Sequence, residues 1–133
     1  MYKIIFYKDV NGQNLIKEYI KSLKQNDSKD NNIKFKKIIS YIRILQQEGI
    51  SIGKPYVKHI EGKIWELRPL RDRILFAYCD NNEIVLLTIF MKQTQKTPRR
   101  EIKKAKKLLE DYLKRSDWKW VKNFKPGMNL KRS

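Results

Sequence analysis

The stretch Glu83–Lys92 reads EIVLLTIFMK and is the most apolar part of the chain. A strand with one face in water alternates apolar and polar residues, whereas a strand covered on both faces can be apolar throughout. The apolar run itself, Ile84–Met91, has the length of a strand and is far shorter than the roughly 18 residues that suggest a transmembrane helix. The stretch therefore predicts a central strand that is covered on both faces of its sheet.

Two further strands are predicted directly before this central strand. Lys63–Arg68 (KIWELR) alternates, so its apolar residues lie on one face, and Glu66 and Arg68 lie on the other. A turn separates it from Arg73–Tyr78 (RILFAY). The polar residues of Asp80–Glu83 then indicate a hairpin into the central strand.

Apolar residues at helical spacing predict three helices. The first covers Gln13–Leu23. The second is capped by Asp30 or Asn31 and ends at Gly49, a residue suited to the position after a helix. The third follows the central strand, with Thr97 as N-cap and Pro98 at its first position.

The order of these elements defines a fold class. Tyr2–Tyr7, a β-branched and aromatic run, adds an N-terminal strand, so the chain reads as strand, two helices, three strands and a helix. This order predicts an α+β fold, in which a small, mostly antiparallel sheet packs against an N-terminal helical hairpin and a C-terminal helix. We expect one domain over residues 1–115. Residues 116–133 form a basic, aromatic tail, which is flexible, docks on a partner or packs as a final arm.

The charge of the chain is unusual for its size. Its 133 residues suit a single domain with one core. They include 31 Lys and Arg against 14 Asp and Glu, which gives a net charge of +17 and a pI near 10.0. Such a field attracts a polyanion such as nucleic acid, the ribosome, an anionic membrane or an acidic protein. Solubility alone is the competing explanation.

Several classes of protein do not fit this composition. The one cysteine, Cys79, rules out an internal disulfide and suits a reducing compartment. The N-terminus turns polar too early for a secretory signal, so we expect a cytoplasmic protein that is not bound to a membrane. One histidine and one cysteine do not make a metal site, and no phosphate-binding glycine loop is present, so no cofactor is expected. Cys79 and His59 are a poor nucleophile and base, because Cys79 follows an apolar strand and should be buried.

What remains for chemistry is a cluster of cations on and beside the predicted strands, with one carboxylate among them. RNA cleavage without a metal needs such groups, because guanidinium ions stabilise the extra negative charge of the phosphoryl transition state. A carboxylate, a lysine or a histidine can move the protons. A structural cluster of ion pairs at a sheet edge is the alternative. The residues are Glu66, Arg68, Arg71, Arg73, Lys92 and Lys96.

Two sequence blocks connect this cluster to a known family. The first reads IWELRP, a single further residue, and then RDRILF; the second, ending at Pro98, reads FMKQTQKTP and leads into RREI. With GKPYVKH at Gly53–His59 and VLL at Val85–Leu87, they resemble the HigB-like, phage-derived branch of the RelE toxin superfamily. The likeness covers about residues 2–113. It does not extend to the tail.

The resemblance implies a RelE-like fold and the toxin of a type II toxin–antitoxin system. It implies a ribosome-dependent, metal-independent endoribonuclease that cuts mRNA by attack of a 2′-hydroxyl on the adjacent phosphate and so inhibits translation. The implied partners are a helix-turn-helix antitoxin of the HigA type, the ribosome and mRNA, with operator DNA contacted only through the toxin–antitoxin complex.

The resemblance also assigns roles to residues. Carried over by position, Arg68 and Arg73 bind the scissile phosphate, Lys92 assists them, and Glu66 and His59 are candidates for proton transfer. Other basic residues would hold RNA by its backbone, because ten Lys and Arg face three acidic residues over residues 92–115. These are Arg71, Lys96, Arg99, Lys103, Lys106 and Lys107.

Two other functions fit the same fold. ParE-like relatives of the superfamily poison DNA gyrase and cut no RNA, but they lack the basic set present here. A non-catalytic module that only binds its antitoxin or RNA is the second alternative.

Overall fold

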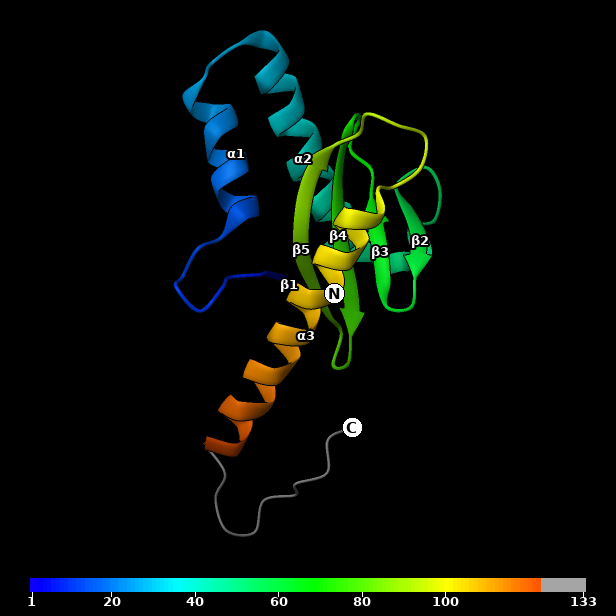
Figure 1. The fold of residues 1–133 in the computed structure, drawn as a ribbon. Helices are drawn as coiled ribbons and strands as arrows, with labels where there is room; N and C mark the ends of the chain where they lie inside the picture. The colour runs from blue at the N-terminus through cyan, green and yellow to red at the C-terminus, as the bar shows by residue number, and fades with distance from the viewer. Residues whose placement is uncertain (123–133) are drawn as a thin grey trace.

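The computed structural model describes the backbone of residues 1–122 and the side chains of residues 1–116. A five-stranded sheet lies between a helical hairpin on one face and a single long helix on the other (Figure 1). The elements in chain order are β1 (Lys3–Phe6), α1 (Leu15–Gln25), α2 (Lys29–Glu48), the 3₁₀ helix η1 (Gly49–Ile52), β2 (Val57–Glu61), β3 (Ile64–Leu67), β4 (Asp72–Cys79), β5 (Glu83–Met91) and α3 (Arg99–Lys122).

The strand order in the sheet is β1-β5-β4-β3-β2. Strands β2 to β5 form antiparallel pairs in sequence order, and β1 pairs with β5 in parallel. The predicted α+β class and the predicted central strand are therefore confirmed. A β-bulge at Leu87 shifts the pairing of β4 and β5, so that Leu75 lies opposite Thr88 and Phe76 opposite Leu86.

Alternation along the strands divides the core into two clusters. Apolar residues of α1 and α2 pack on one face of the sheet, against Leu67, Ile74, Phe76, Ile84 and Leu86. Ala105 and Leu109 of α3 pack on the other face, against Ile64, Leu75, Ala77, Val85 and Leu87. Strands β4 and β5 are covered on both sides, which explains why they are almost entirely apolar.

The sequence patterns misplaced three features. Strand β2 was not predicted, because only its first residue, Val57, is buried and the alternation is weak. Helix α2 begins at Lys29, with Ser28 as its N-cap, whose hydroxyl accepts a hydrogen bond from Asn31 N at 3.1 Å. Asp30 and Asn31 therefore lie in the first turn, and neither is the cap.

Helix α3 also differs from the prediction at both ends. It begins at Arg99, and the Thr97 hydroxyl donates a hydrogen bond to Glu66 (2.6 Å). It continues to Lys122, beyond the point where the apolar spacing ends, so seven residues of the expected tail are helical. Residues 123–133 of that tail lie outside the described residues. Along the described chain, no helix is both long and apolar enough to cross a membrane.

A buried polar network joins the helical hairpin to the sheet. The Asp72 carboxylate, 1% exposed at the start of β4, accepts a hydrogen bond from the Tyr19 hydroxyl of α1 at 2.7 Å. That hydroxyl in turn accepts one from Lys34 Nζ of α2 at 2.8 Å, and Lys34 Nζ lies 3.6 Å from Asp72. Burial raises the pKa of Tyr19, which keeps the hydroxyl protonated and able to donate. The network therefore fixes both helices relative to β4.

We predict that Tyr19→Phe lowers the free energy of unfolding by about 1–3 kcal/mol, because Asp72 loses its hydrogen-bond donor while staying buried. Urea unfolding followed by circular dichroism measures this change. Tyr56→Phe is the matched control: Tyr56 is partly buried and its hydroxyl makes no hydrogen bond within residues 1–116, so we expect a change within about 0.5 kcal/mol. Equal losses in the two variants would refute a stabilising role for the network.

Candidate functional site

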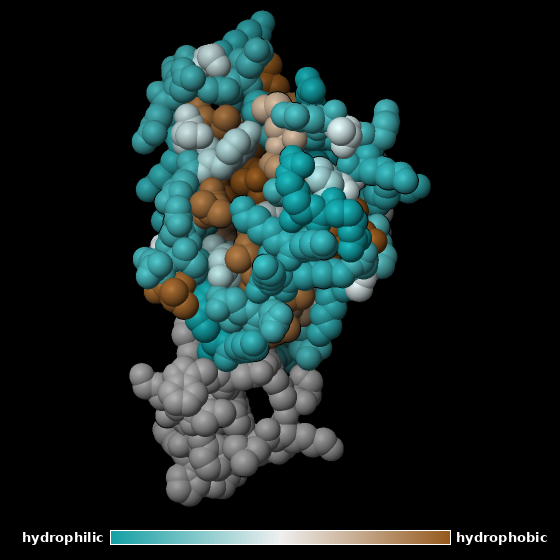
Figure 2. All heavy atoms as spheres, in the orientation of Figure 1, coloured by the Kyte–Doolittle hydropathy of each residue, from teal (hydrophilic) through white to brown (hydrophobic). Residues whose placement is uncertain are grey.

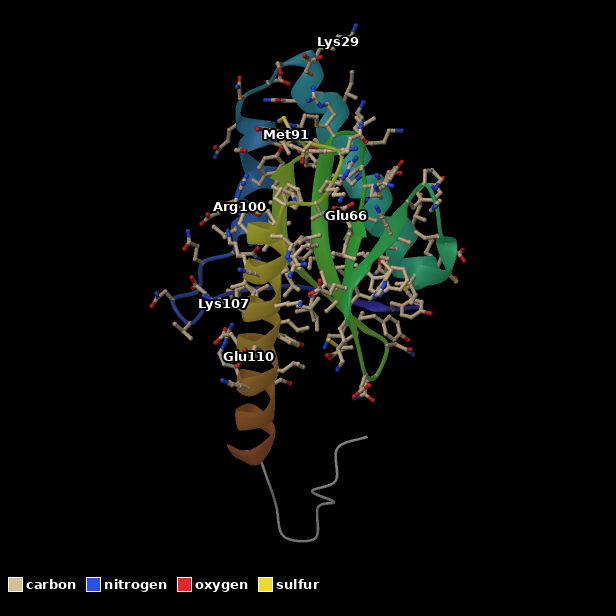
Figure 3. All side chains as sticks on the ribbon, turned by 45° about the vertical axis from the view of Figure 1, so that its right-hand side comes forward. Lys29, Glu66, Met91, Arg100, Lys107 and Glu110 are labelled. Atoms are coloured by element: carbon tan, nitrogen blue, oxygen red, sulfur yellow. The ribbon has the colours of Figure 1, made fainter. Side chains whose placement is uncertain are left out.

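Glu66 lies at the centre of a charged cluster on the α3 side of the sheet. The residue is 3% exposed, and its Oε1 lies 3.5 Å from Arg68 Nε and 3.8 Å from Arg73 Nε. Its Oε2 accepts the hydrogen bond from the Thr97 hydroxyl. The carboxylate thus contacts two arginines and the loop before α3. Figure 3 labels Glu66 on the sheet.

Arg73 is held by the turn that precedes its strand. Its Nη1 donates to the carbonyl oxygens of Leu70 at 2.7 Å and Asp72 at 2.9 Å. Leu70 has a φ of 56°, in the left-handed region, and this conformation belongs to the same turn. Burial and then the neighbouring Arg68 charge lower the pKa of Arg73, although an arginine keeps its proton in proteins. Among the described residues no hydrogen bond engages Nη2, so this nitrogen is left to bind another acceptor.

The loop of residues 92–98 covers this cluster. It is tied at its start by a hydrogen bond from Lys92 N to Arg71 O (2.8 Å) and near its end by the Thr97 hydroxyl. The space that it encloses beside Glu66 is about 10 Å³, enough for roughly one water molecule. The lining residues are Lys58, Glu66, Arg68, Arg73, Phe90, Lys92 and residues 93–98.

A second, larger cavity of about 420 Å³, which is a shallow depression wide open to solvent, lies on the Arg71 side of the same loop. Arg73 and Lys92 line both spaces. A polyanion can therefore reach these two cations from the Arg71 side, whereas the Glu66 side is nearly filled. The structure brings together Glu66, Arg68, Arg73, Lys92 and Lys96 around one loop, with Arg71 at its outer side.

His59 is not part of this arrangement. In the β2–β3 pairing it lies opposite Trp65, whereas Lys58 lies opposite Glu66. The His59 ring packs against Trp65 with ring centroids 4.9 Å apart, and its Nε2 is 2.7 Å from Gly62 O. Because neighbouring residues of a strand point to opposite faces, His59 faces away from Glu66.

Lys58, and not His59, lies beside Glu66. It is exposed, lies beside Glu66 on the neighbouring strand, and lines the pocket. The one available signal was Gly62, a turn residue between this segment and β3. Without strand β2, no sequence pattern favours Lys58 over His59.

The basic residues of α3 fall into two groups. Arg99 Nη1 lies 2.7 Å from Glu61 Oε1, and Lys106 also forms an ion pair with Glu61, so these two cations are already compensated. Lys114 and Arg115 are paired within the helix, with Glu110 and Asp111. The other basic residues of α3 with described side chains are exposed and form no ion pair among those side chains: Arg100, Lys103, Lys104 and Lys107. Arg100 and Lys107 project from α3 in Figure 3, and Figure 2 shows mainly hydrophilic residues over the helix.

The described residues contain no group of three or more His, Cys, Asp or Glu side chains that could hold a metal ion. Cys79 is buried, as the sequence suggested. The arrangement offers instead an arginine pair, several lysines and one buried carboxylate. This set can bind a phosphate group and exchange protons with it.

The protein is an α+β protein with a basic pocket on its sheet. Comparison of its sequence with known families shows to which family it belongs. The family model described as Phage derived protein Gp49-like (DUF891) matches residues 17–110, well over half of the chain. The chain belongs to this family, which consists of RelE/HigB-like toxins in general. A comparison with curated proteins finds no match. The resemblance to the toxin superfamily is thereby confirmed, and the HigB-like branch stays a prediction.

We predict that Glu66→Gln destabilises the protein by about 3 kcal/mol, because two close guanidinium ions lose the buried carboxylate between them. Inorganic phosphate should then raise the melting temperature of this variant more than that of the wild type, since the anion can bind the uncompensated arginines. Thermal unfolding with and without phosphate measures both effects.

Glu110→Gln is the control for this variant, because Glu110 pairs with Lys114 on the exposed face of α3. We expect a change within about 0.5 kcal/mol and no added response to phosphate. A Glu66→Gln variant as stable as the wild type would show that the carboxylate does not hold the arginines together.

Proposed function

We propose that this protein is the toxin of a type II toxin–antitoxin system and that it cuts mRNA on the ribosome, in the cytoplasm, without a metal ion. The observation that carries the proposal is the convergence of Arg68, Arg73 and Lys92 on one pocket, with Arg73 reachable from the open side. Membership of a toxin family supports it.

In the proposed reaction a 2′-hydroxyl of the RNA loses its proton and its oxygen forms a bond to the adjacent phosphorus. The bond from phosphorus to the 5′-oxygen of the next nucleotide breaks, and that oxygen takes up a proton. The products are a cyclic phosphate and a free 5′-hydroxyl. Negative charge on the phosphoryl oxygens grows in the transition state, and the protein has to stabilise it.

Arg73 is the residue best placed to do this, because its guanidinium is fixed by the turn and its Nη2 is not engaged by the described residues. Arg68 supplies a second charge beside it. Glu66 holds the two arginines together, which makes it a positioning residue. Proton transfer then falls to the pocket lysines, Lys58, Lys92 and Lys96.

The proposed partners follow from this activity. A HigA-like helix-turn-helix antitoxin would neutralise the toxin, and operator DNA would be contacted only through their complex. Ribosome and mRNA carry the negative charge that a protein of net charge +17 attracts. The uncompensated stripe of Arg100, Lys103, Lys104 and Lys107 would follow the RNA backbone from the pocket along α3.

We predict that Arg73→Ala abolishes growth arrest on expression and slows mRNA cleavage by about 10²- to 10³-fold, because one preorganised charge donor is lost. Cleavage is followed by primer extension on ribosomes programmed with a defined mRNA. Arg43→Ala, which removes an exposed arginine of α2, should leave both readouts unchanged. Undiminished toxicity of Arg73→Ala would exclude this site and favour a ParE-like or purely binding function.

We predict that replacing Lys103, Lys104 and Lys107 by Gln weakens ribosome binding and flattens its dependence on salt. Each phosphate contact to a single strand contributes a slope of about −0.7, so three contacts contribute about −2. Equilibrium binding at several salt concentrations measures this slope. Replacement of Lys17, Lys21 and Lys29, exposed on the hairpin, removes the same charge elsewhere and should have a smaller effect. Equal effects of both triple variants would indicate a response to net charge alone.

A further inference from the structure

The outer edge of β1 carries backbone groups that the described part of the chain does not use. Lys3 N and Tyr7 N each donate a hydrogen bond of 2.8 Å to a carbonyl oxygen of β5 or of the turn before it. Alternate residues of a strand direct their N–H and C=O groups to opposite sides, so those of Ile4 and Phe6 point away from β5. Among the described residues no hydrogen bond engages these four groups. Strand β1 is therefore an open sheet edge.

The opposite edge of the sheet is protected in a way that β1 is not. In β2 the pairing register shifts between His59 and Glu61, and such a bulge blunts an edge. The Glu61 carboxylate also pairs there with two cations of α3. In contrast, β1 pairs with β5 without a shift over Lys3–Phe6. Of the two edges, β1 is the one that presents a regular row of unused donors and acceptors.

A cavity of about 250 Å³ lies along this open edge. Ile5 and Phe6 both line it, although Ile5 packs toward α3 and Phe6 toward the helical hairpin, so the cavity borders the edge of β1. On its far side is the part of α3 that runs past β1 (Figure 1). The remaining lining residues are Lys8 and, from α3, Tyr112, Arg115 and Ser116. The open edge and α3 thus form the two walls of one groove.

Contacts between α3 and the end of β1 hold this groove in place. The Tyr7 hydroxyl donates a hydrogen bond to Asp111 Oδ2 at 2.6 Å, and Arg115 Nη2 donates one to Lys8 O. Arg115 Nη2 also lies 2.8 Å from Asp111 Oδ2, and the Arg115 guanidinium carbon is 5.4 Å from the centre of the Tyr7 ring. A ligand would therefore enter a groove whose walls are already positioned, which lowers the free-energy cost of binding.

We infer that the β1 edge binds an extended, acidic segment of a partner protein, which adds a sixth strand to the sheet. Such a segment can form hydrogen bonds with Ile4 and Phe6, while alternate side chains enter the groove. Ile5 and Phe6 give the groove an apolar wall, so an apolar side chain suits it. Lys3 and Lys8, at the two ends of β1, are exposed and form no ion pair with the described residues, so acidic side chains suit the flanks. The inference does not rest on the proposed cleavage of RNA.

Charge and backbone chemistry favour this occupant over two others. A second copy of the chain would bring together two proteins of net charge +17, with Lys3 and Lys8 of each copy at the joined edges. A nucleic acid would attract the lysines, but its phosphates offer acceptors without the alternating donors that a strand edge requires. An extended acidic polypeptide satisfies both the charges and the backbone groups.

The test is hydrogen exchange of the β1 amides, measured by NMR on the full chain. The probe is a synthetic nine-residue peptide in which valine alternates with glutamate and phenylalanine replaces the central valine. We expect it to slow exchange of the Ile4 and Phe6 amides by at least about tenfold, because amides held in hydrogen bonds exchange slowly. The Lys3 and Tyr7 amides already donate hydrogen bonds, so their exchange is the internal reference and should change little.

Three further probes separate strand pairing from charge attraction. Methylation of the backbone amide nitrogens of the peptide removes its donors and should abolish the protection. A peptide with lysine in place of glutamate should not bind. A single-stranded oligonucleotide of the same charge as the acidic peptide should leave both amides unprotected. Equal protection by the methylated peptide or the lysine peptide, or protection by the oligonucleotide, would overturn the inference.

A pair of double variants tests the charged flanks. Lys3→Glu with Lys8→Glu should weaken binding of the acidic peptide by about tenfold, because two attractive charges become repulsive. Lys54→Glu with Lys63→Glu is the matched control, since it makes the same change in net charge beside β2 and should bind within about twofold of the wild type. Equal weakening in the two double variants would indicate a response to net charge alone and would overturn the inference.

Two results with the wild type would also overturn it. One is unchanged exchange of the Ile4 and Phe6 amides at millimolar acidic peptide. The other is protection of these amides without peptide that rises with protein concentration, which would place a second copy of the chain at the edge. Because no RNA is cut in these assays, a failure of the proposed reaction leaves their outcome unchanged.

Discussion

Two neighbouring charges at the start of β4, Asp72 and Arg73, set the arrangement of the whole molecule. Successive residues of a strand point to opposite faces, so Asp72 enters the network with Tyr19 and Lys34 while Arg73 enters the pocket. Both are nearly fully buried, and the charged side chains nearest to each lie on its own face: Lys34 for Asp72, and Glu66 for Arg73. A slip of one residue in the register of β4 would turn each of these side chains to the opposite face and leave both charges buried without partners. The free-energy cost of burying two unpaired charges would exceed the stability of a small domain. The register of β4 is therefore fixed by charge as well as by apolar burial.

The buried Glu66 carboxylate explains how the site keeps its shape before any ligand binds. Two guanidinium ions at close range repel each other, and the Glu66 carboxylate between them offsets part of that repulsion. Because the same carboxylate accepts a hydrogen bond from Thr97, the loop of residues 92–98 is fixed to the cluster that it covers. An incoming phosphate would then meet arginines already oriented, which is how a site stabilises developing charge without reorganising first.

Much of this arrangement follows from sequence patterns, and the exceptions have physical causes. The apolar run of β5 predicts its central place, and the alternation in KIWELR places Glu66 and Arg68 on one face. These patterns are strong because burial selects the residues on both sides of a strand. Strand β2 has one buried residue, so its pattern is weak, and without this strand no pattern shows that Lys58 rather than His59 lies beside Glu66. The ion pairs of Glu61 with Arg99 and Lys106 join residues far apart in sequence, and local patterns carry no signal for such contacts.

Helix α3 completes the site by fixing the far end of the loop. Glu61 holds its N-terminal half through Arg99 and Lys106. Farther along the helix, Asp111 accepts a hydrogen bond from Tyr7 at 2.6 Å and pairs with Arg115, and these contacts lower the pKa of Asp111. With α3 attached to β2 and to the segment after β1, the loop before it spans two fixed points, Lys92 at the end of β5 and Thr97 beside Glu66. The shape of the cavity on the Arg71 side therefore depends on contacts at both edges of the sheet, although the residues that line it come from two short stretches of the chain.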